Sequence, residues 1–212
     1  MPVAAVPAPR LTRWVENFET SHGTTTYAVA EGALAGQAQD GSHFTARLPF
    51  EVAYAGPADP ASFAAAVSVP ERWGVLLVRK GGFAIARLAG EKVEESKVGQ
   101  RHVQGRTKAG GQSQQRFARR RGNQARQAYE AAADHAARIL TGPMALVTGG
   151  DHAAVDAVLT DPRLSALTVV GPWLPVPDPR RATLDGAIAD ATSVRVEVTN
   201  APQGQSRGPS HG

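Results

Sequence analysis

The 212-residue chain contains no cysteine, which excludes disulfides, cysteine nucleophiles and zinc–thiolate sites. It has no apolar run as long as a membrane span, so we expect no membrane partner. Residues 1–9 do not combine a basic segment with a following apolar segment, and so do not form a secretory signal. These absences together predict a cytoplasmic protein.

The usual machinery of a hydrolase is also missing. None of the six histidines pairs with another histidine or with an acidic residue at a spacing typical of metal ligands. No serine lies in a nucleophile-elbow pattern. Glu94 and Glu95 are neighbours on an expected strand, where adjacent side chains face opposite ways. We therefore expect no metal and no cofactor, and any chemistry must proceed without a strong protein base.

Acidic residues are absent from one segment, residues 101–126, although basic residues are frequent there. The segment contains Arg101, Arg106, Lys108, Arg116, Arg119, Arg120, Arg121 and Arg126. The formal net charge of the whole chain is only +4, so the remainder is slightly acidic. Such asymmetry is typical of a nucleic-acid contact, and the alternative is an ordinary solvated face.

The length suits a single domain. We predict a flexible tail over residues 1–9, one α/β domain over 10–199, and a disordered tail over 200–212, which is rich in Gly, Pro, Gln and Ser. Apolar residues at helical spacing predict a helix that begins near Leu11 and ends before Gly23. Partial alternation predicts a strand over 44–54. Two apolar runs around Gly81 and Gly82 predict a hairpin over 74–89.

The second half of the chain alternates between helices and strands. We predict a strand over 92–103, followed by a long helix over 114–140 with arginines opposite a stripe of alanines. Helices are then expected over 151–159 and 181–191, and strands over 145–148, 167–170 and 193–199. The last strand is expected to close the sheet. This order predicts an α/β fold in which helices pack on one mixed β-sheet and a long basic helix follows a loop.

That loop carries Gly110-Gly111-Gln112 directly before the basic helix. Two glycines free the backbone to adopt left-handed conformations and to approach a ligand closely. Gln112 presents a neutral amide and a backbone N–H, and the arginines that follow are suited to hold phosphate. The segment therefore suits ester chemistry at the end of an RNA.

The run Gly110-Gly111-Gln112-Ser113-x-x-Arg116-Phe117-Ala118-Arg119-x-Arg121 resembles the Gly-Gly-Gln region in the middle domain of archaeal and eukaryotic class I release factors. The flanking residues are more similar to the actinobacterial Vms-like release factor family, and the local match covers about residues 98–140. The resemblance implies a middle-domain-like fold and a peptidyl-tRNA hydrolase that acts on the large ribosomal subunit and its 23S rRNA.

By the same resemblance, Gly110, Gly111 and Gln112 are the catalytic residues, and we favour Gln112 over Gln114 as the functional amide because the register fits without a gap. The implied RNA-binding residues are Arg106, Lys108, Ser113, Gln114, Gln115, Arg116, Arg119, Arg120, Arg121 and Arg126. Residues 1–109 leave no room for a separate stop-codon-reading domain, so we expect codon-independent rescue. The sequence carries no oligomer signal, and we expect a monomer. The alternatives are a tRNA acceptor-end endonuclease and a non-catalytic rRNA-binding module.

Overall fold

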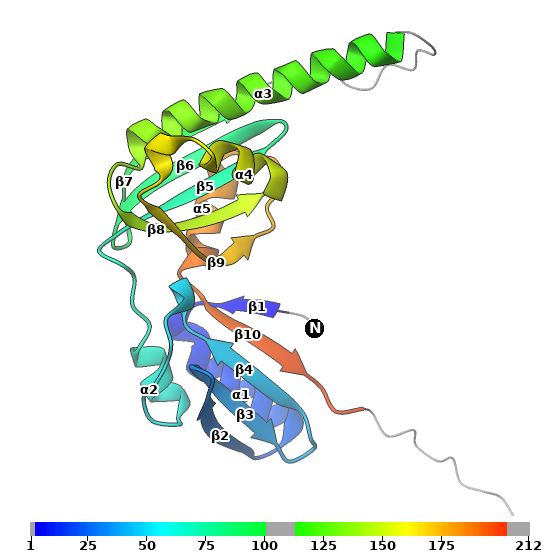
Figure 1. Cartoon of the computed structure of the whole chain (residues 1–212). Coiled ribbons are helices and arrows are strands. Elements are labelled where there is room, and N and C mark those ends of the chain that lie inside the picture. Colours follow the sequence, from blue (N-terminus) through cyan, green and yellow to red (C-terminus); the bar gives the residue numbers. More distant parts are fainter. Residues whose placement is uncertain (1–2, 101–112, 203–212) are drawn as a thin grey trace, which may run out of the picture. The chain divides into compact units, whose positions relative to one another are not determined.

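The computed structural model describes the backbone of residues 3–100 and 113–202, and the side chains of these residues except 113–125. The chain divides into two compact units (Figure 1). Unit 1 comprises Met1–Leu48, Val52–Val67 and Ser193–Gly212, and unit 2 comprises Pro49–Glu51 and Ser68–Thr192. That residues 10–199 form a single folding domain stays a prediction.

Unit 1 contains an antiparallel five-stranded sheet in the order β1-β10-β4-β3-β2. Its elements are β1 (Val3–Val6), η1 (Ala8–Arg10), α1 (Leu11–His22), β2 (Thr25–Ala30), β3 (Ala33–Ala38), β4 (His43–Arg47), α2 (Pro60–Ala65) and β10 (Val194–Thr199). The apolar face of α1 buries Leu11, Val15 and Phe18. The ring of Phe18 meets that of Phe44 from β4 edge to face at 5.1 Å, so α1 covers one face of this sheet.

Unit 2 contains a mixed five-stranded sheet in the order β7-β6-β5-β8-β9. Its elements are η2 (Pro49–Glu51), β5 (Arg72–Arg79), β6 (Gly82–Ala89), β7 (Lys92–Gln100), α3 (Ser113–Ile139), β8 (Met144–Gly150), α4 (His152–Leu159), η3 (Pro162–Leu164), β9 (Leu167–Leu174) and α5 (Arg181–Ala191). Strands β5, β6 and β7 pair antiparallel, whereas β8 pairs parallel with both β5 and β9.

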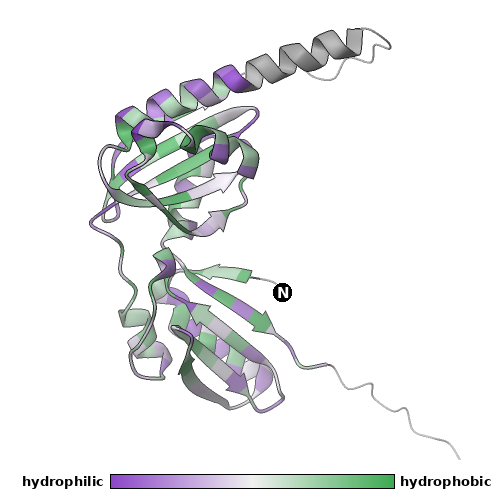
Figure 2. Ribbon diagram, in the orientation of Figure 1, coloured by the Kyte–Doolittle hydropathy of each residue, from purple (hydrophilic) through white to green (hydrophobic). Residues whose placement is uncertain are grey.

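The central strands β5, β6 and β8 of unit 2 are almost continuously buried because helices cover both faces of the sheet. Leu76 and Ile85 belong to the core beneath α3 and α4, and Val75 and Leu77 belong to the core beneath α5. Apolar residues accordingly concentrate in the central strands, as Figure 2 shows. Within the described residues, none of the helices is long and apolar enough to cross a membrane.

The structure corrects the prediction of one mixed sheet, because the described residues form two five-stranded sheets. The strand predicted over 193–199 is present as β10, but it lies between β1 and β4 in unit 1 and does not close the sheet of unit 2. Residues 3–6, expected in a flexible tail, form β1, which pairs with β10 from Val3↔Glu197 to Val6↔Val194. The predicted strand over 44–54 ends at Arg47, followed by η2.

Candidate nucleic-acid interface

Four strands of unit 2 run in the same direction and end at one edge of its sheet. Gln100 at the end of β7 pairs with Gly82, and Gly82 pairs with Arg79 at the end of β5. On the other side of β5, Val78 pairs with Gly150 at the end of β8. Strand β9 ends beside β8, where Gly149 pairs with Leu174. We call this edge the loop edge, because the segment that carries the Gly-Gly-Gln tripeptide follows Gln100.

The proposed catalytic residues Gly110, Gly111 and Gln112, together with Arg106 and Lys108, lie outside the described residues. Seven predicted RNA-binding residues belong to the first half of α3, and their side chains also lie outside the described part: Ser113, Gln114, Gln115, Arg116, Arg119, Arg120 and Arg121. Arg126 is described, and its side chain is exposed. The helix predicted over 114–140 is therefore observed as α3, and the basic character of its leading half stays a prediction.

The second half of α3 packs on the sheet through small residues. Ala132 and Ala136 are fully buried, Ala128 and Ala133 are nearly so, and Ile139 is fully buried at the C-terminal end. This stripe confirms the predicted buried face at Ala132 and Ala136. Small side chains let the helix axis approach the strands closely, and in Figure 1 the other half of α3 extends past the loop edge.

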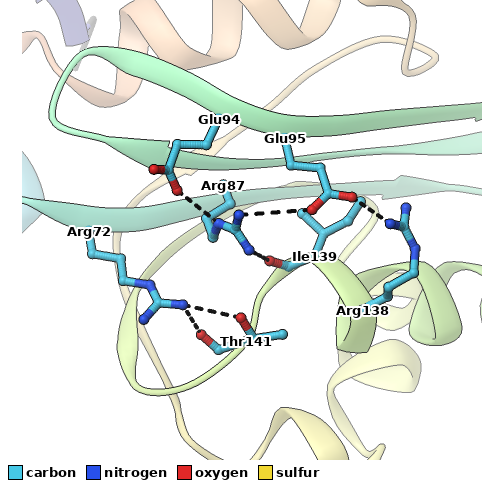
Figure 3. Close-up of polar contacts among 7 residues, drawn as sticks. All are labelled: Arg72, Arg87, Glu94, Glu95, Arg138, Ile139 and Thr141. Atoms are coloured by element: carbon cyan, nitrogen blue, oxygen red, sulfur yellow. Dashed lines mark hydrogen bonds and ion pairs between the residues drawn. The ribbon is translucent and has the colours of Figure 1, made fainter.

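Arginine side chains fix the C-terminal end of α3 (Figure 3). Arg87 on β6 donates from Nη1 to the carbonyl oxygen of Ile139 at 3.0 Å and from Nε to Glu94 at 3.0 Å. Glu95 on β7 accepts from Arg138 of α3 at 2.5 Å. A cation at the last turn of a helix satisfies free carbonyls and opposes the negative end of the helix dipole.

A second anchor, from Arg72 on β5, lies just past the end of α3. Arg72 donates to the carbonyl oxygen of Thr141, and to the Thr141 hydroxyl at 3.1 Å. Glu94 and Glu95 were expected to face opposite ways, but both lie against Arg87, where the register of β6 and β7 shifts. Their role visible here is to hold α3 against β6 and β7.

A third anchor connects α3 to η3. Arg163 donates to Asp134 of α3 at 2.7 Å and to Asp161 at 2.6 Å. Hydrogen bonds from the side chain and the backbone N–H of Arg163 lower the pKa of Asp161 to about 2. The bonds to Asp161 and Asp134 raise the pKa of the Arg163 guanidinium. A pocket of about 500 Å³ lies between α3, α4 and η3. Its lining includes Asp134, Asp161, Arg163, Arg126 and Tyr129.

Sequence reasoning missed a pair of stacked rings at the loop edge. His152, the first residue of α4, stacks on Trp173 of β9 with ring centroids 3.5 Å apart and planes inclined by 11°. The prediction that a helix begins at Asp151 is confirmed, since Asp151 is the N-cap of α4, although its side chain makes no capping hydrogen bond. The strand predicted over 167–170 is longer in the structure, because β9 continues to Leu174. No local pattern links His152 to Trp173, so sequence alone gave no signal.

Metal ligands do not gather in the described part of the chain. No group of three or more His, Asp or Glu residues is placed there to hold an ion. His135, which lies on α3, packs its ring 5.4 Å from that of Phe83. His135 therefore serves as a packing residue in the structure.

A known protein family matches a region that includes most of unit 2. Residues 71–197 match the family described as Actinobacteria/chloroflexi VLRF1 release factor. The matched region is more than half of the chain, and the chain belongs to this family. This match confirms the release factor family that the Gly-Gly-Gln segment resembles. The match covers β5 to α5 and most of β10, whereas residues 1–70 precede it. No curated protein matches the chain.

Proposed function

We propose that this protein is a ribosome-dependent peptidyl-tRNA hydrolase that releases nascent chains from stalled large subunits without reading a codon. The observation that carries the proposal is the position of Gly110-Gly111-Gln112 within the matched family region. The segment lies between Gln100, where β7 ends, and Ser113, where α3 begins. The partners would be peptidyl-tRNA and the 23S rRNA of the large subunit, and the site of action would be the cytoplasm.

The proposed chemistry follows from what a glutamine can do. A carboxamide is not a useful base at neutral pH, but it donates and accepts hydrogen bonds. Gln112 would hold a water molecule in line with the ester carbonyl, and its backbone N–H would donate to the oxygen on which negative charge develops. As the water oxygen bonds to the carbonyl carbon, the ester bond to the terminal ribose 3′-oxygen would break. The departing 3′-oxygen would take up a proton, relayed from the water by an RNA group such as the 2′-hydroxyl or by solvent.

The basic residues around the loop would supply affinity rather than chemistry. Lys108, Arg116, Arg119 and Arg120 would bind phosphates of the tRNA end or of rRNA. Such contacts release counterions, so binding should weaken steeply as salt increases. The anchored second half of α3 holds the axis of this helix against the sheet.

The test is a release assay with purified protein and large subunits that carry peptidyl-tRNA. Gln112→Ala should abolish most peptide release, whereas Gln114→Ala should retain it. Release by Gln112→Ala at the wild-type rate would refute the assignment of the catalytic amide. The tRNA product should keep an intact 3′ end, because ester hydrolysis leaves the polynucleotide whole. A shortened tRNA would instead establish an endonuclease, and binding without any product would establish a non-catalytic rRNA-binding module.

A further inference from the structure

The stacked pair at the loop edge has one covered ring and one open ring. Trp173 is half-buried and packs against the core beneath α3 and α4. His152 covers it in a nearly parallel stack and is itself exposed. The face of the imidazole opposite Trp173 is therefore available to a further flat partner.

The backbone around this pair is closely packed, which fixes the position of His152. The backbone N–H of Asp151 donates to the carbonyl oxygen of Val78 at 2.9 Å. Gly150 has φ +105°, and a side chain there would lie 2.3 Å from that same carbonyl oxygen. A side chain at Gly149 would lie 2.3 Å from the carbonyl oxygen of Leu174. Only glycine fits at either position, so the turn that carries His152 is held against β5 and β9.

The pair also lies close to where α3 leaves the sheet. Burial raises the pKa of the Tyr129 phenol on α3, and the negative charge of Asp151, the neighbour of His152, raises it further. Arg79 lies along the same edge, since its Cγ would be 3.1 Å from a side chain at Gly150. The stacked rings are therefore at the end of the unit from which the Gly-Gly-Gln segment and the leading half of α3 extend.

We propose that His152, supported by Trp173, is a platform on which an unpaired nucleobase of the bound RNA stacks. This inference rests on the proposed function, because it adds a binding subsite to the same RNA-directed edge. Unpaired bases are typically recognised by stacking on aromatic side chains, and every base offers a flat face. Acidic residues are also present at this edge, Asp151 beside the platform and Asp178 beside Gly81. The platform therefore acts through ring stacking and not through charge.

The platform is tested by binding measurements on the full chain. The probe is a fluorescein-labelled single-stranded oligoribonucleotide that ends in CCA, and a second probe of equal length lacks that end. His152→Ala should weaken binding by about 5- to 150-fold, the usual range for loss of one stacked base, and His152→Tyr should restore it. The matched control is His43→Ala, which removes an exposed histidine from β4 in unit 1.

Salt dependence separates stacking from charge. His152→Ala should leave the slope of log affinity against log salt unchanged, because no phosphate contact is lost. A merely structural role would lower the melting temperature of His152→Ala and would not be rescued by one ring in place of another. Trp173→Ala should weaken binding as His152→Ala does. If Trp173→Ala does not fold, the variants of His152, whose side chain is exposed, still test the platform.

The outcomes also separate this inference from the proposed function. Loss of affinity for both probes supports a general platform for unpaired bases such as those of rRNA loops, and loss for the CCA probe alone assigns the tRNA end. Unchanged affinity of His152→Ala for both probes overturns the platform, even if wild-type protein releases peptide. Loss of affinity in a protein that releases no peptide retains the platform and overturns the hydrolase. Ribosome binding that depends on His152 while neither RNA probe does would point to a protein partner and overturn the proposal.

Discussion

Removal of the Arg87 guanidinium should destabilise unit 2 by about 2–4 kcal/mol. Arg87→Met keeps the aliphatic stem but deletes the bond to the Ile139 carbonyl and the ion pair with Glu94. A hydrogen bond from a charged donor contributes about 1.5–3 kcal/mol, and its loss leaves a carbonyl of a buried residue unpaired. The ion pair adds about 0.2–1 kcal/mol because Glu94 is 42% exposed.

Arg138→Met is the matched control, since it also removes a guanidinium bound to a β7 carboxylate. Its side chain is 58% exposed, so its ion pair with Glu95 should contribute only about 0.2–1 kcal/mol. Urea unfolding is followed by fluorescence in a Trp14→Phe background, because the remaining tryptophans, Trp73 and Trp173, both lie in unit 2. Equal losses for the two variants, or a loss below about 1 kcal/mol for Arg87→Met, would refute the reasoning.

Three further predictions address other parts of the molecule. Hydrogen bonds to Arg163 lower the pKa of Asp161 to about 2. The stabilising effect of ionised Asp161 is therefore complete above the ordinary aspartate pKa of about 4, and it is lost as the pH falls toward about 2. Asp161→Asn should flatten the acid limb of a plot of unfolding free energy against pH. Gly36→Ala places a Cβ 2.3 Å from the Phe44 ring and should destabilise unit 1 by about 1–3 kcal/mol, measured by urea unfolding with Trp14 fluorescence, while Gly186→Ala, where nothing lies within 4 Å, should not destabilise unit 2, measured with the fluorescence of Trp73 and Trp173. Arg119→Gln should weaken binding to large subunits and reduce the salt slope by about one, whereas Arg181→Gln, an exposed arginine on α5 paired with Asp185, should leave that slope unchanged.

Local sequence patterns predicted the elements of unit 2 well. The hairpin at Gly81-Gly82 forms between β5 and β6, and α3, α4 and α5 lie close to their expected bounds. These elements have strong periodicity or turn signals within one segment. Strands β2 and β3 were missed because they are short and rich in alanine and threonine, although Tyr27 and Val29 alternate correctly before the turn at Glu31-Gly32.

Sheet membership could not be derived from such patterns. A strand pattern says which side chains face a core, but it does not say which distant strand is the partner. Strand β10 follows α5 directly, yet its neighbours are β1 and β4 from the beginning of the chain. The same limit applies to the interface: the Gly-Gly-Gln tripeptide is contiguous and was found, whereas the stacked rings of His152 and Trp173 meet only in the folded unit.

The anchored half of α3 has a consequence for its leading half. The first turn of any helix is costly to nucleate, and a segment that contains Gly122 and many polar residues is a marginal helix by itself. Once the turns around Ala132 and Ala136 are buried, further turns need only propagation, one hydrogen bond for each residue ordered. Anchors such as Arg87, at the opposite end of α3, help to hold these packed turns in place, so we expect their loss to weaken the helical order of the leading half. If the proposed hydrolase activity is correct, Arg87→Met should raise the KM for ribosome-bound substrate more than Arg138→Met does, even though neither residue belongs to the predicted RNA-binding set.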